Sequence, residues 1–377
     1  MSPNGWKEAT LNDIAYLNYG KSLTADARKK GSIPVYSSSG ITGQHDRALV
    51  DEEGIIIGRK GNVGSVFYSK QPFYCIDTAY YIKKSDLKCD IKYLYYLLKT
   101  LRLERLNEDS AVPGLNRDTA LSQTFDYPES IETQRRIAEI LSALDDKIEL
   151  NRQTNATLEA IAQAIFKEWF VNFNFPGATG ELVESELGMI PKGWKILPMD
   201  KIADFLNGLA LQNYPAENDY DYLPVIKIRE MKNGITDSSD KASKNLPAKY
   251  IVHDGDLLFS WSGSLEIIFW VGGDGALNQH LFKVTSNNYP IWFCYFWILQ
   301  YIDKFKGIAE DKTTTMGHIQ RHHISEAICL IPDKLENIDK VMNPIIEKII
   351  NNQKEVILLA KIRDALLPKL MSGEIEL

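Results

Sequence analysis

Two long stretches of the chain place their hydrophobic residues at alternating spacings of four and three, the pattern of a coiled-coil helix. The first seam consists of Ile137, Leu141, Leu144, Ile148, Asn151, Asn155, Leu158, Ala162, Ile165 and Trp169. The second consists of Ile338, Met342, Ile345, Ile349, Asn352, Val356, Leu359, Arg363, Leu366 and Leu370. A seam with a period of about 3.5 residues requires a partner helix that keeps it buried. The two patterns therefore predict helical regions over residues 131–172 and 333–377, packed on each other as an antiparallel pair.

Two polar residues occupy equivalent positions in these seams. Asn151 and Asn352 lie 201 residues apart, the same separation as the flanking hydrophobic positions. A polar residue in a coiled-coil seam weakens packing but fixes the register of the helices. We therefore predict a register role for both residues. The alternative is that both are tolerated at the edge of the seam.

Outside these helices the hydrophobic runs are short and separated by turn-rich segments. In the first half, strands are predicted at residues 33–36, 54–57, 65–68 and 79–82, followed by a helix over 91–105. In the second half, strands are predicted at 222–228, 256–260, 266–271 and 280–284, followed by a helix over 290–305. Strands and helices do not alternate as in a dinucleotide-binding fold. The pattern predicts an α+β fold, mixed α/β in each half.

The two halves repeat one another in order. The tripeptide Gly5-Trp6-Lys7 recurs as Gly193-Trp194-Lys195, and Gly20 recurs as Gly208 at the same offset of 188 residues. The motif Ile33-Pro34-Val35 likewise matches Leu223-Pro224-Val225. A period near 200 residues is too long for a solenoid repeat. We therefore predict two duplicated globular domains, residues 1–130 and 193–332, each followed by a helical region, with a linker at 173–192.

Composition narrows the class of protein only modestly. The net charge is −7, and residues 131–192 alone hold 6 Lys+Arg against 10 Asp+Glu, a net of −4. A DNA-binding surface needs local basic clusters rather than a basic chain, so the overall charge does not exclude DNA. No signal peptide is visible, and the longest apolar run spans nine residues, 291–299, where a membrane helix needs roughly 20. The four scattered cysteines are typical of buried thiols in a reducing compartment. We expect a soluble, cytoplasmic protein.

Candidate chemistry in the first half centres on a basic glycine-rich loop, residues 58–64. Arg59, Lys60 and Asn62 are placed there with backbone amides that suit a phosphate. The loop lacks the GxxxxGK spacing of a nucleotide-hydrolysing phosphate loop. A purely structural turn is the alternative. Further candidates for DNA contact are Ser38, Gln44 and Arg117.

The second half offers a different set at the matching positions. The loop at 260–264 has no charge, and its candidates are Ser260 and Ser262. Asn278 and Gln279 carry amides of the kind that pair with adenine, although ordinary loop hydrogen bonds explain them equally well. The remaining candidates are His318 and Arg321, the latter matching Arg117. His318 and His322 have i,i+4 spacing, but no Glu or Cys ligand follows at motif distance, so we expect no metal site.

Known catalytic signatures are missing from the sequence. The chain has no NPPY-like methyltransferase tetrad, no PD…ExK nuclease core and no GxSxG elbow. These absences favour a non-catalytic chain.

The sequence as a whole resembles the specificity subunits of type I restriction–modification systems. The most characteristic passages are ETQRRIAEILSALDDKIELN at 132–151, LEAIAQAIFK at 158–167, IPKGW at 190–194 and LLPKLMSGEI at 366–375. The resemblance covers essentially the whole chain. It implies that each globular domain recognises one half of a bipartite double-stranded DNA site, and that the helices set the unread spacer.

The resemblance also implies partners and cofactors. Two modification subunits would dock on this chain and methylate adenines with S-adenosylmethionine, and restriction subunits would add ATP- and Mg²⁺-dependent translocation and cleavage. This chain itself would bind no cofactor. Two alternatives stay open: a coiled-coil scaffold that does not bind DNA, and the recognition part of a fused adenine methyltransferase.

Overall fold

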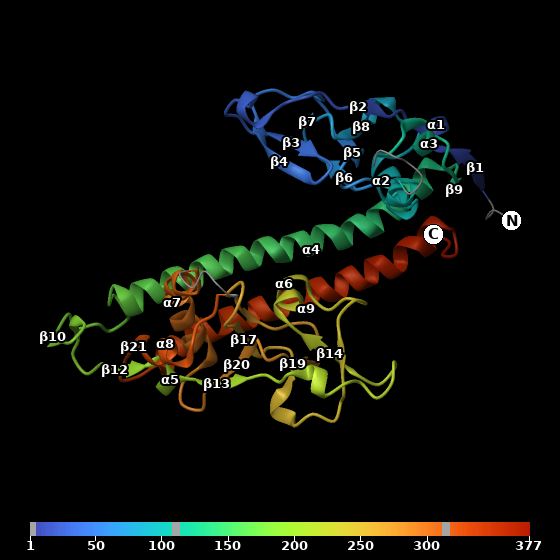
Figure 1. The fold of residues 1–377 in the computed structure, drawn as a ribbon. Helices are drawn as coiled ribbons and strands as arrows, with labels where there is room; N and C mark the ends of the chain where they lie inside the picture. Colours follow the sequence, from blue (N-terminus) through green and yellow to red (C-terminus); the bar gives the residue numbers. More distant parts are fainter. Residues whose placement is uncertain (1–4, 108–113, 311–316) are drawn as a thin grey trace. The chain divides into compact units, whose positions relative to one another are not determined.

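The computed structural model describes residues 5–107, 114–310 and 317–377 (Figure 1). The chain forms two compact units. Unit 1 comprises Met1–Ile148 with Leu358–Leu377, and unit 2 comprises Glu149–Ile357. The two long helices, α4 (Ile131–Phe166) and α9 (Glu336–Met371), each contribute a segment to both units. A π-helical turn, Lys167–Val171, extends α4. The two predicted long helices are confirmed.

The described part of unit 1 contains three small sheets and three short helices. The central sheet is antiparallel, in the order β2 (Asn18–Tyr19), β8 (Ala79–Lys83), β5 (Gly54–Gly58) and β6 (Val66–Ser69). A second sheet has the order β4 (Gly40–His45), β3 (Ile33–Ser37) and β7 (Tyr74–Cys75), with β3 and β7 parallel. Strands β1 (Trp6–Thr10) and β9 (Thr124–Pro128) pair antiparallel. The helices are α1 (Leu11–Ile14), α2 (Ile91–Thr100) and α3 (Arg117–Leu121), with 3-10 turns at Ala25–Ala27, Lys84–Asp86 and Leu103–Asn107.

Unit 2 repeats this plan. Its central sheet has the order β13 (Asp204–Asn207), β20 (Leu281–Thr285), β17 (Leu257–Ser260) and β18 (Ile267–Phe269). A second sheet has the order β15 (Lys241–Ala242), β14 (Leu223–Ile226), β19 (Gly275–Leu277) and β16 (Ile251–Val252), with β14 and β19 parallel. Strands β12 (Lys195–Pro198) and β21 (Ile328–Ile331) pair antiparallel, and β10 (Leu182–Ser185) forms a hairpin with β11 (Gly188–Pro191). The helices are α5 (Met199–Ile202), α6 (Ile228–Asn233), α7 (Ile291–Glu310) and α8 (Arg321–Ser325), with 3-10 turns at Leu211–Asn213 and Ala248–Tyr250.

The repeated glycines show why the duplication is visible in the sequence. A Cβ atom at Gly20 would lie 2.0 Å from the carbonyl oxygen of Ile76, and one at Gly208 would lie 2.2 Å from that of Asn278. In both units the chain leaving the first strand of the central sheet passes directly against the segment that precedes the second. Only glycine fits such a close backbone approach. The predicted pair Gly20 and Gly208 therefore marks the same structural position.

Each unit buries its helices against its own central sheet. The side chain of Asp90 caps α2 by accepting hydrogen bonds from the amides of Lys92 and Tyr93. One face of α2 is then buried with the sheet and with residues of α4 and α9. In unit 2, α7 presents Trp292, Phe293 and other aromatic residues to an equivalent core. The aromatic helices and the central sheets thus form one main core in each unit, and smaller buried clusters lie beside it.

Contacts within unit 2 show that the long helices run antiparallel. Asn352 donates a hydrogen bond to the side-chain oxygen of Asn155 at 2.8 Å, and Asn155 donates to the carbonyl oxygen of Ile349 at 3.0 Å. Asn151 donates to the carboxylate of Glu355 at 2.9 Å. The predicted register residues are therefore buried, but they do not pair with each other, because the antiparallel offset places Asn155 opposite Asn352. The burial of Asn151 and Asn352 (3% and 1% exposed) disagrees with the alternative that they lie at the edge of the seam.

The helix pair has a different character in unit 1. Arg363 donates to Asp145 at 2.6 Å, and the Tyr96 hydroxyl donates to the other oxygen of Asp145 at 2.7 Å. Arg363 occupies a predicted seam position, so this half-buried ion pair replaces a hydrophobic contact. Every residue of the two predicted seams is buried or half-buried.

Further properties of the chain concern its cysteines and its apolar segments. Cys75, Cys294 and Cys329 are buried and free, and burial raises the pKa of Cys75 and Cys294 to about 12. These thiols therefore stay protonated and inert near neutral pH. No helix within the described ranges has the length and apolar character needed to cross a membrane.

Candidate nucleic-acid interface

A polar corner forms in unit 1 where β5 ends, β8 begins and α3 starts. We call Ser38, Arg59, Lys60, Asn62 and Arg117 the first corner. The amides of Arg59 and Lys60 both donate to the carbonyl of Thr78, and the carbonyl of Arg59 accepts from the amide of Leu115 at 2.8 Å. These backbone bonds hold the glycine-rich loop against the start of β8 and the segment before α3. Three parts of the sequence thus converge on one surface.

Arg59 is held by aromatic rings. Its guanidinium lies 5.1 Å from the ring centroid of Tyr19 and 5.8 Å from that of Tyr80, and it donates to the carbonyl of Asp77 at 3.3 Å. Arginine over an aromatic face gains cation–π attraction while keeping donors for another partner. Arg59 is therefore positioned without a carboxylate.

Arg117 shares the same aromatic platform. Its guanidinium lies 5.4 Å from the ring of Tyr19 and 5.8 Å from that of Tyr16. Tyr16 and Tyr19 are 50% and 48% exposed, so the platform faces solvent. Arg117 also forms an ion pair with the adjacent Asp118 at 3.7 Å, and Asp118 is highly exposed.

The rest of the first corner is a network of small polar groups. Asn62 is exposed and donates to the hydroxyl of Ser39 at 3.1 Å. Ser38 is only 5% exposed, and its backbone is bonded to Thr78 and Ser65. Ser38 thus lies beneath the loop, whereas Lys60 and Asn62 lie on it. Among the residues the structure describes, no carboxylate pairs with Arg59 or Lys60, so the corner carries net positive charge.

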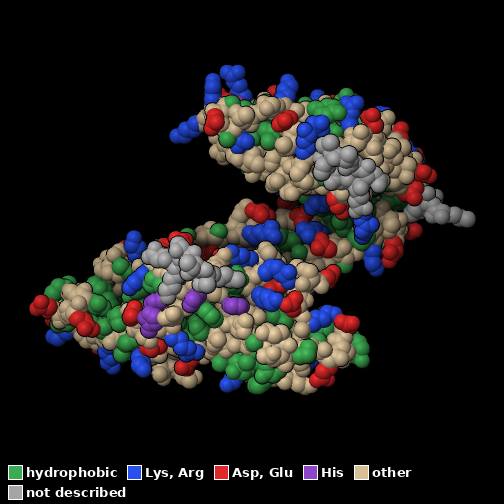
Figure 2. Space-filling model, in the orientation of Figure 1, with side chains coloured by type: hydrophobic (Ala, Val, Ile, Leu, Met, Phe, Trp, Pro, Cys, Tyr) green, Lys and Arg blue, Asp and Glu red, His purple; other side chains and the backbone are tan. Residues whose placement is uncertain are grey.

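Gln44 lies on a different hairpin of unit 1. It is exposed on β4, opposite Pro34 of β3. Arg28 braces this hairpin by donating to the carbonyl of Thr42 at 2.7 Å. In Figure 2, Lys and Arg side chains project from the part of unit 1 that carries β3 and β4. The basic residues of this segment include the exposed side chains Lys29, Lys30 and Arg47.

The matching corner of unit 2 is aromatic and neutral. We call Trp261, Ser262, Asn278, Gln279, His280 and His318 the second corner. Trp261 takes the position of Arg59, because its amide bonds to the carbonyl of His280 as that of Arg59 bonds to Thr78. Its indole nitrogen donates to the side chain of Asn207 at 2.9 Å and to the carbonyl of Gln279 at 3.1 Å. The indole is therefore fixed in the loop.

Four predicted residues of unit 2 meet around this indole. The hydroxyl of Ser262 lies 3.0 Å from the ring nitrogen Nδ1 of His280, and Ser262 forms a β-bridge with His318. The side-chain oxygen of Asn278 accepts from the amide of His280 at 3.1 Å. The side chain of Gln279 lies 3.5 Å from ring nitrogen Nε2 of His280.

The other two predicted residues of unit 2 lie apart from this group. Arg321 stacks over Phe282 at 5.8 Å, as Arg117 does over tyrosine in unit 1. Ser260 is fully buried, and its hydroxyl bonds within its own hairpin. Arg321 thus keeps the position of Arg117, and Ser260 acts as a turn residue.

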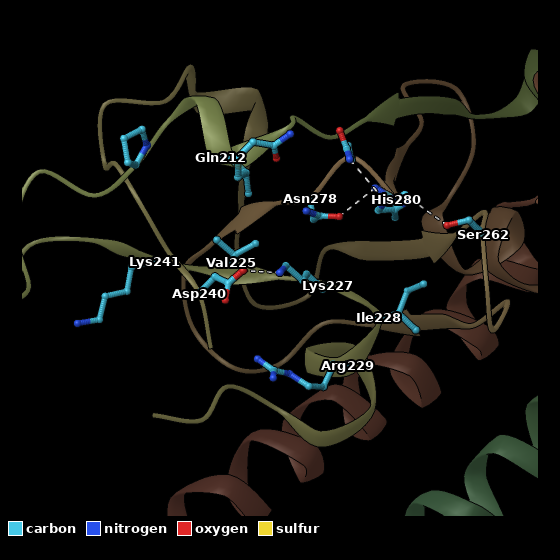
Figure 3. A pocket seen from close by; sticks show the side chains of 13 residues that line it. Gln212, Val225, Lys227, Ile228, Arg229, Asp240, Lys241, Ser262, Asn278 and His280 are labelled. Carbon is cyan, nitrogen blue, oxygen red and sulfur yellow. Dashed lines mark hydrogen bonds and ion pairs between the residues drawn. The ribbon is translucent and has the colours of Figure 1, made fainter. Parts of the chain in front are cut away.

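Four residues of the second corner, Ser262, Asn278, Gln279 and His280, line a cavity of about 600 Å³ (Figure 3). The facing wall carries Lys227, Arg229, Asp240 and Lys241, and Gln212 lies at its rim. Lys227 forms an ion pair with Asp240, and Lys241 forms one with Asp219 at 2.9 Å. The side chain of Lys227 lowers the pKa of Asp240. Cations here are therefore balanced by acids, unlike those of the first corner.

A buried carboxylate positions Arg229 at this cavity. Glu230 is 1% exposed and accepts two hydrogen bonds from Arg229, at 2.7 and 2.9 Å, and one from Ser239 at 3.0 Å. Burial opposes the charged form of Glu230, but the bonds from Arg229, Ser239 and the amide of Lys227 outweigh it and lower its pKa. Arg229 is thereby fixed with part of its guanidinium facing the cavity (Figure 3).

The histidines of unit 2 lie in several different contacts. The ring of His318 packs edge-on against Trp261 at 6.1 Å, and the ring of His322 lies 3.9 Å from that of His323. Figure 2 shows histidines gathered on one face of unit 2. Within the described ranges, no group of three or more His, Cys, Asp or Glu residues has a metal-binding arrangement.

Comparison with known proteins identifies the family of the chain that carries these two corners. A family model described as "Type I restriction modification DNA specificity domain" matches residues 3–160 and 191–361. The chain belongs to this specificity family. The two matched segments correspond to the two copies found in the sequence.

Relatives within the specificity family support the assignment. The MjaIX specificity subunit of a type I restriction enzyme, from Methanocaldococcus jannaschii, is 31% identical over 310 residues, covering 75% of this chain and 69% of that protein. The HindI specificity subunit from Haemophilus influenzae is 25% identical over 329 residues, covering 70% and 71%. The chain thus resembles DNA-specificity subunits over most of its length.

A solved structure shows the same fold. The S subunit of a type I restriction–modification system from M. genitalium aligns with a TM-score of 0.67 at 16% identity, covering 98% of this chain and 99% of that one. The likeness extends over both copies and both long helices. The fold of this specificity-family chain is therefore a duplicated mixed α/β module with a pair of long helices, as the sequence predicted.

The sequence predicted part of this candidate interface of the specificity-family chain. The prediction included the glycine-rich loop and the Asn278–Gln279 segment, and the structure brings their neighbours together. It missed Lys227, Arg229, His280 and the basic residues around Gln44. Two signals were available: the run Arg28-Lys29-Lys30, and the alternation of Lys227 and Arg229 after a buried strand.

Proposed function

We propose that this specificity subunit reads a bipartite DNA site, one half with each unit, through the first and second corners. The observation that carries the proposal is that equivalent positions of one duplicated fold hold different chemistry. Arg59 and Trp261 share a position, since the amide of each donates to the carbonyl of the residue just before the second strand of its central sheet. Two copies that differ at their surface suit a target with two different halves.

The first corner has the chemistry of a phosphate and guanine contact. Arg59, Lys60 and Arg117 are cations without a buried acid partner, and arginine donates in pairs to guanine or to phosphate oxygens. Net positive charge also favours binding that depends strongly on salt. Unit 1 therefore supplies much of the electrostatic attraction to DNA.

The second corner and its cavity suit base edges. Asn278 and Gln279 offer amides that can pair with adenine, and Arg229 is held ready by Glu230. The ion-paired cations add little net charge, so binding here depends on geometry more than on salt. Ser262 and His280 complete a fixed polar wall for hydrogen bonding.

The helices and the partners complete the proposal. The antiparallel helix pair sets the unread spacer and docks two modification subunits, and restriction subunits join that complex. Most residues of the two long helices outside the seam are polar. These residues leave helix surface available for partner subunits. S-adenosylmethionine, ATP and Mg²⁺ act on the partner subunits, and this chain performs no catalysis.

The test is a methylome. The chain is co-expressed with a modification subunit from the same genome in a host free of adenine methylation, and modified adenines are mapped by single-molecule sequencing. We expect a motif of two half-sites separated by an unread spacer, absent when this chain is omitted. A modification subunit that is active with another specificity subunit but gives no motif with this chain would contradict the proposal and favour a scaffold. Methylation by this chain alone would point to a fused methyltransferase.

A further inference from the structure

A small cavity in unit 2 holds a carboxylate that has no cation. The cavity has a volume of about 190 Å³ and lies between α4, α7, α9 and β18. Its walls include Ile267, Ile268, Phe269 and Phe296, and its polar groups include Glu159 of α4 and Gln353 of α9. Glu159 is half-buried, and burial alone raises its pKa. Within the part of the chain that the structure describes, Glu159 has no ion pair.

A second acceptor in this cavity is also unsatisfied. The side-chain oxygen of Gln353 is buried and accepts no hydrogen bond from the described residues. A buried acceptor without a donor costs roughly 1–3 kcal/mol, and a buried charge without a partner costs more. Two such acceptors lining one apolar cavity, with no donor among the described residues, favour an occupant that carries a positively charged donor.

The duplicate site in unit 1 supplies its own cation. Asp145 corresponds to Ile346 of the cavity at the offset of 201, and Tyr96 corresponds to Phe296. In unit 1, Arg363 fills this position and bonds to Asp145 at 2.6 Å. The counterpart of Arg363 in unit 2 is Ala162, which is too short and carries no charge. Unit 2 therefore keeps neither member of this ion pair, and Glu159, whose counterpart at the same offset is Ala360, is an acid of unit 2 alone.

We propose that the Glu159–Gln353 cavity receives a lysine or arginine side chain of a modification subunit. This inference rests on the proposed docking function. The volume is below the roughly 300–1,000 Å³ of pockets for small-molecule ligands, so a single side chain fits it better. A long basic side chain buries its methylene stem against the apolar wall while its charged head reaches the acceptors. DNA is excluded as the occupant because the carboxylate repels phosphate.

The test compares isosteric variants in binding to the modification subunit. Glu159→Gln keeps the shape and removes the charge, and Gln353→Met removes the second acceptor. Glu139→Gln is the matched control, because Glu139 is exposed on the same helix. The full chain is immobilised and purified modification subunit is titrated over it. We expect Glu159→Gln to raise the Kd about 30-fold or more, as removal of one partner of a buried interfacial charge pair does. Gln353→Met weakens binding less, and Glu139→Gln leaves the Kd within about threefold.

The melting temperature of the free chain separates docking from folding. Glu159→Gln removes a half-buried charge that has no partner, so the free chain melts at the same temperature or higher. A lower melting temperature would show that Glu159 has a structural partner and would overturn the inference. So would binding of the Glu159→Gln chain with the wild-type Kd. If the wild-type chain itself does not bind the modification subunit, the proposed docking function fails instead, and this inference with it.

Discussion

Arg59 and Trp261 show how a duplicated fold can carry two different surfaces. Both follow the last residue of a central strand, and the backbone amide of each donates to the carbonyl of the residue just before the neighbouring strand. These hydrogen bonds involve only backbone atoms, so the fold constrains the side chain at this position only by its packing against the neighbouring aromatic rings. A cation over tyrosines satisfies this in unit 1, and an indole bonded to Asn207 satisfies it in unit 2. Recognition residues can change here while the fold is kept.

The first corner allows a direct test at the residue scale. Replacing Arg59 and Lys60 together by alanine removes two cations that form no ion pair with a described carboxylate, so DNA binding weakens and becomes less dependent on salt. Each phosphate contact contributes a slope of about −0.9 in log K against log salt, so the slope falls by about 1 to 2. Fluorescence anisotropy with a duplex containing the methylated motif, at several salt concentrations, measures this. The control is Lys7→Ala with Lys88→Ala, which removes the same charge from exposed positions elsewhere in unit 1. An unchanged slope would reduce the glycine-rich loop to a structural turn.

Glu230 makes the stability of unit 2 depend on pH. Its pKa is lowered from the ordinary value of 4.5 in the folded chain. The stabilisation is therefore complete above the unfolded pKa and is lost as the pH falls through the lower, folded pKa. Glu230→Gln keeps the shape but loses the charge, so the variant is less stable at pH 7 by about 1–3 kcal/mol and loses less on acidification. Urea unfolding followed by tryptophan fluorescence at pH 7 and pH 4 measures both effects. Equal losses of stability on acidification in wild type and variant would contradict this role.

Element-scale features were predictable where they depend on local spacing. The seams of α4 and α9 and the aromatic helices α2 and α7 follow directly from periodic positions in the sequence. Two-residue strands such as β2, β7 and β16 were not predicted, because they contain no periodic pattern and exist only through pairing with distant strands. The parallel pairing of β3 with β7 likewise depends on the folded chain.

The contrast between local spacing and tertiary pairing also explains which residues of the candidate site were predicted from the sequence. The glycine-rich loop was recognisable because its glycines and cations are consecutive. Lys227 and Arg229 were missed because isolated basic residues after a strand are usually solvated. Only the tertiary pairing of Arg229 with the buried Glu230 shows that it is held at a cavity. Asn155 was seen as a seam residue, but its pairing with Asn352 depended on an antiparallel offset that spacing alone does not give.

The asparagine pair provides the test at the element scale. Replacing Asn155 alone by leucine leaves Asn352 buried without its acceptor and destabilises the chain by about 1–3 kcal/mol. Replacing both by leucine removes the unsatisfied groups and restores hydrophobic packing, so the double variant recovers most or all of this loss. Urea unfolding of the two single variants and the double variant gives the coupling energy. Thr157→Ala, at an exposed position of α4, should change stability by less than about 0.5 kcal/mol. Additive losses in the double variant would show that the two asparagines act independently.

At the scale of the whole molecule, the main feature is that two copies of one fold carry different side chains at equivalent positions. The two units differ at equivalent positions in ways that are individually stable: Arg363 with Asp145 in one, and Ala162 with Ile346 in the other. The two corners differ in charge where DNA is proposed to bind, and the Arg363–Asp145 ion pair of unit 1 has no counterpart beside the Glu159–Gln353 cavity. A duplicated chain can thus present two different DNA surfaces and two non-identical docking surfaces without changing its fold.

The helices permit the most informative test of the whole assembly. Inserting one heptad into α4 keeps the seam in phase and adds about 10 Å of helix at 1.5 Å per residue, close to three base pairs of B-DNA. If the helix pair sets the spacer, the methylated motif keeps both half-sites and accepts a different spacer, because the corners are untouched. A matched insertion in both α4 and α9 preserves their pairing and should shift the spacer with less loss of methylation. Mapping the methylome of each variant beside wild type measures the outcome. An unchanged spacer in an active variant would show that the distance between half-sites is fixed elsewhere than in the helices, and a changed half-site would show that the helices also shape the corners.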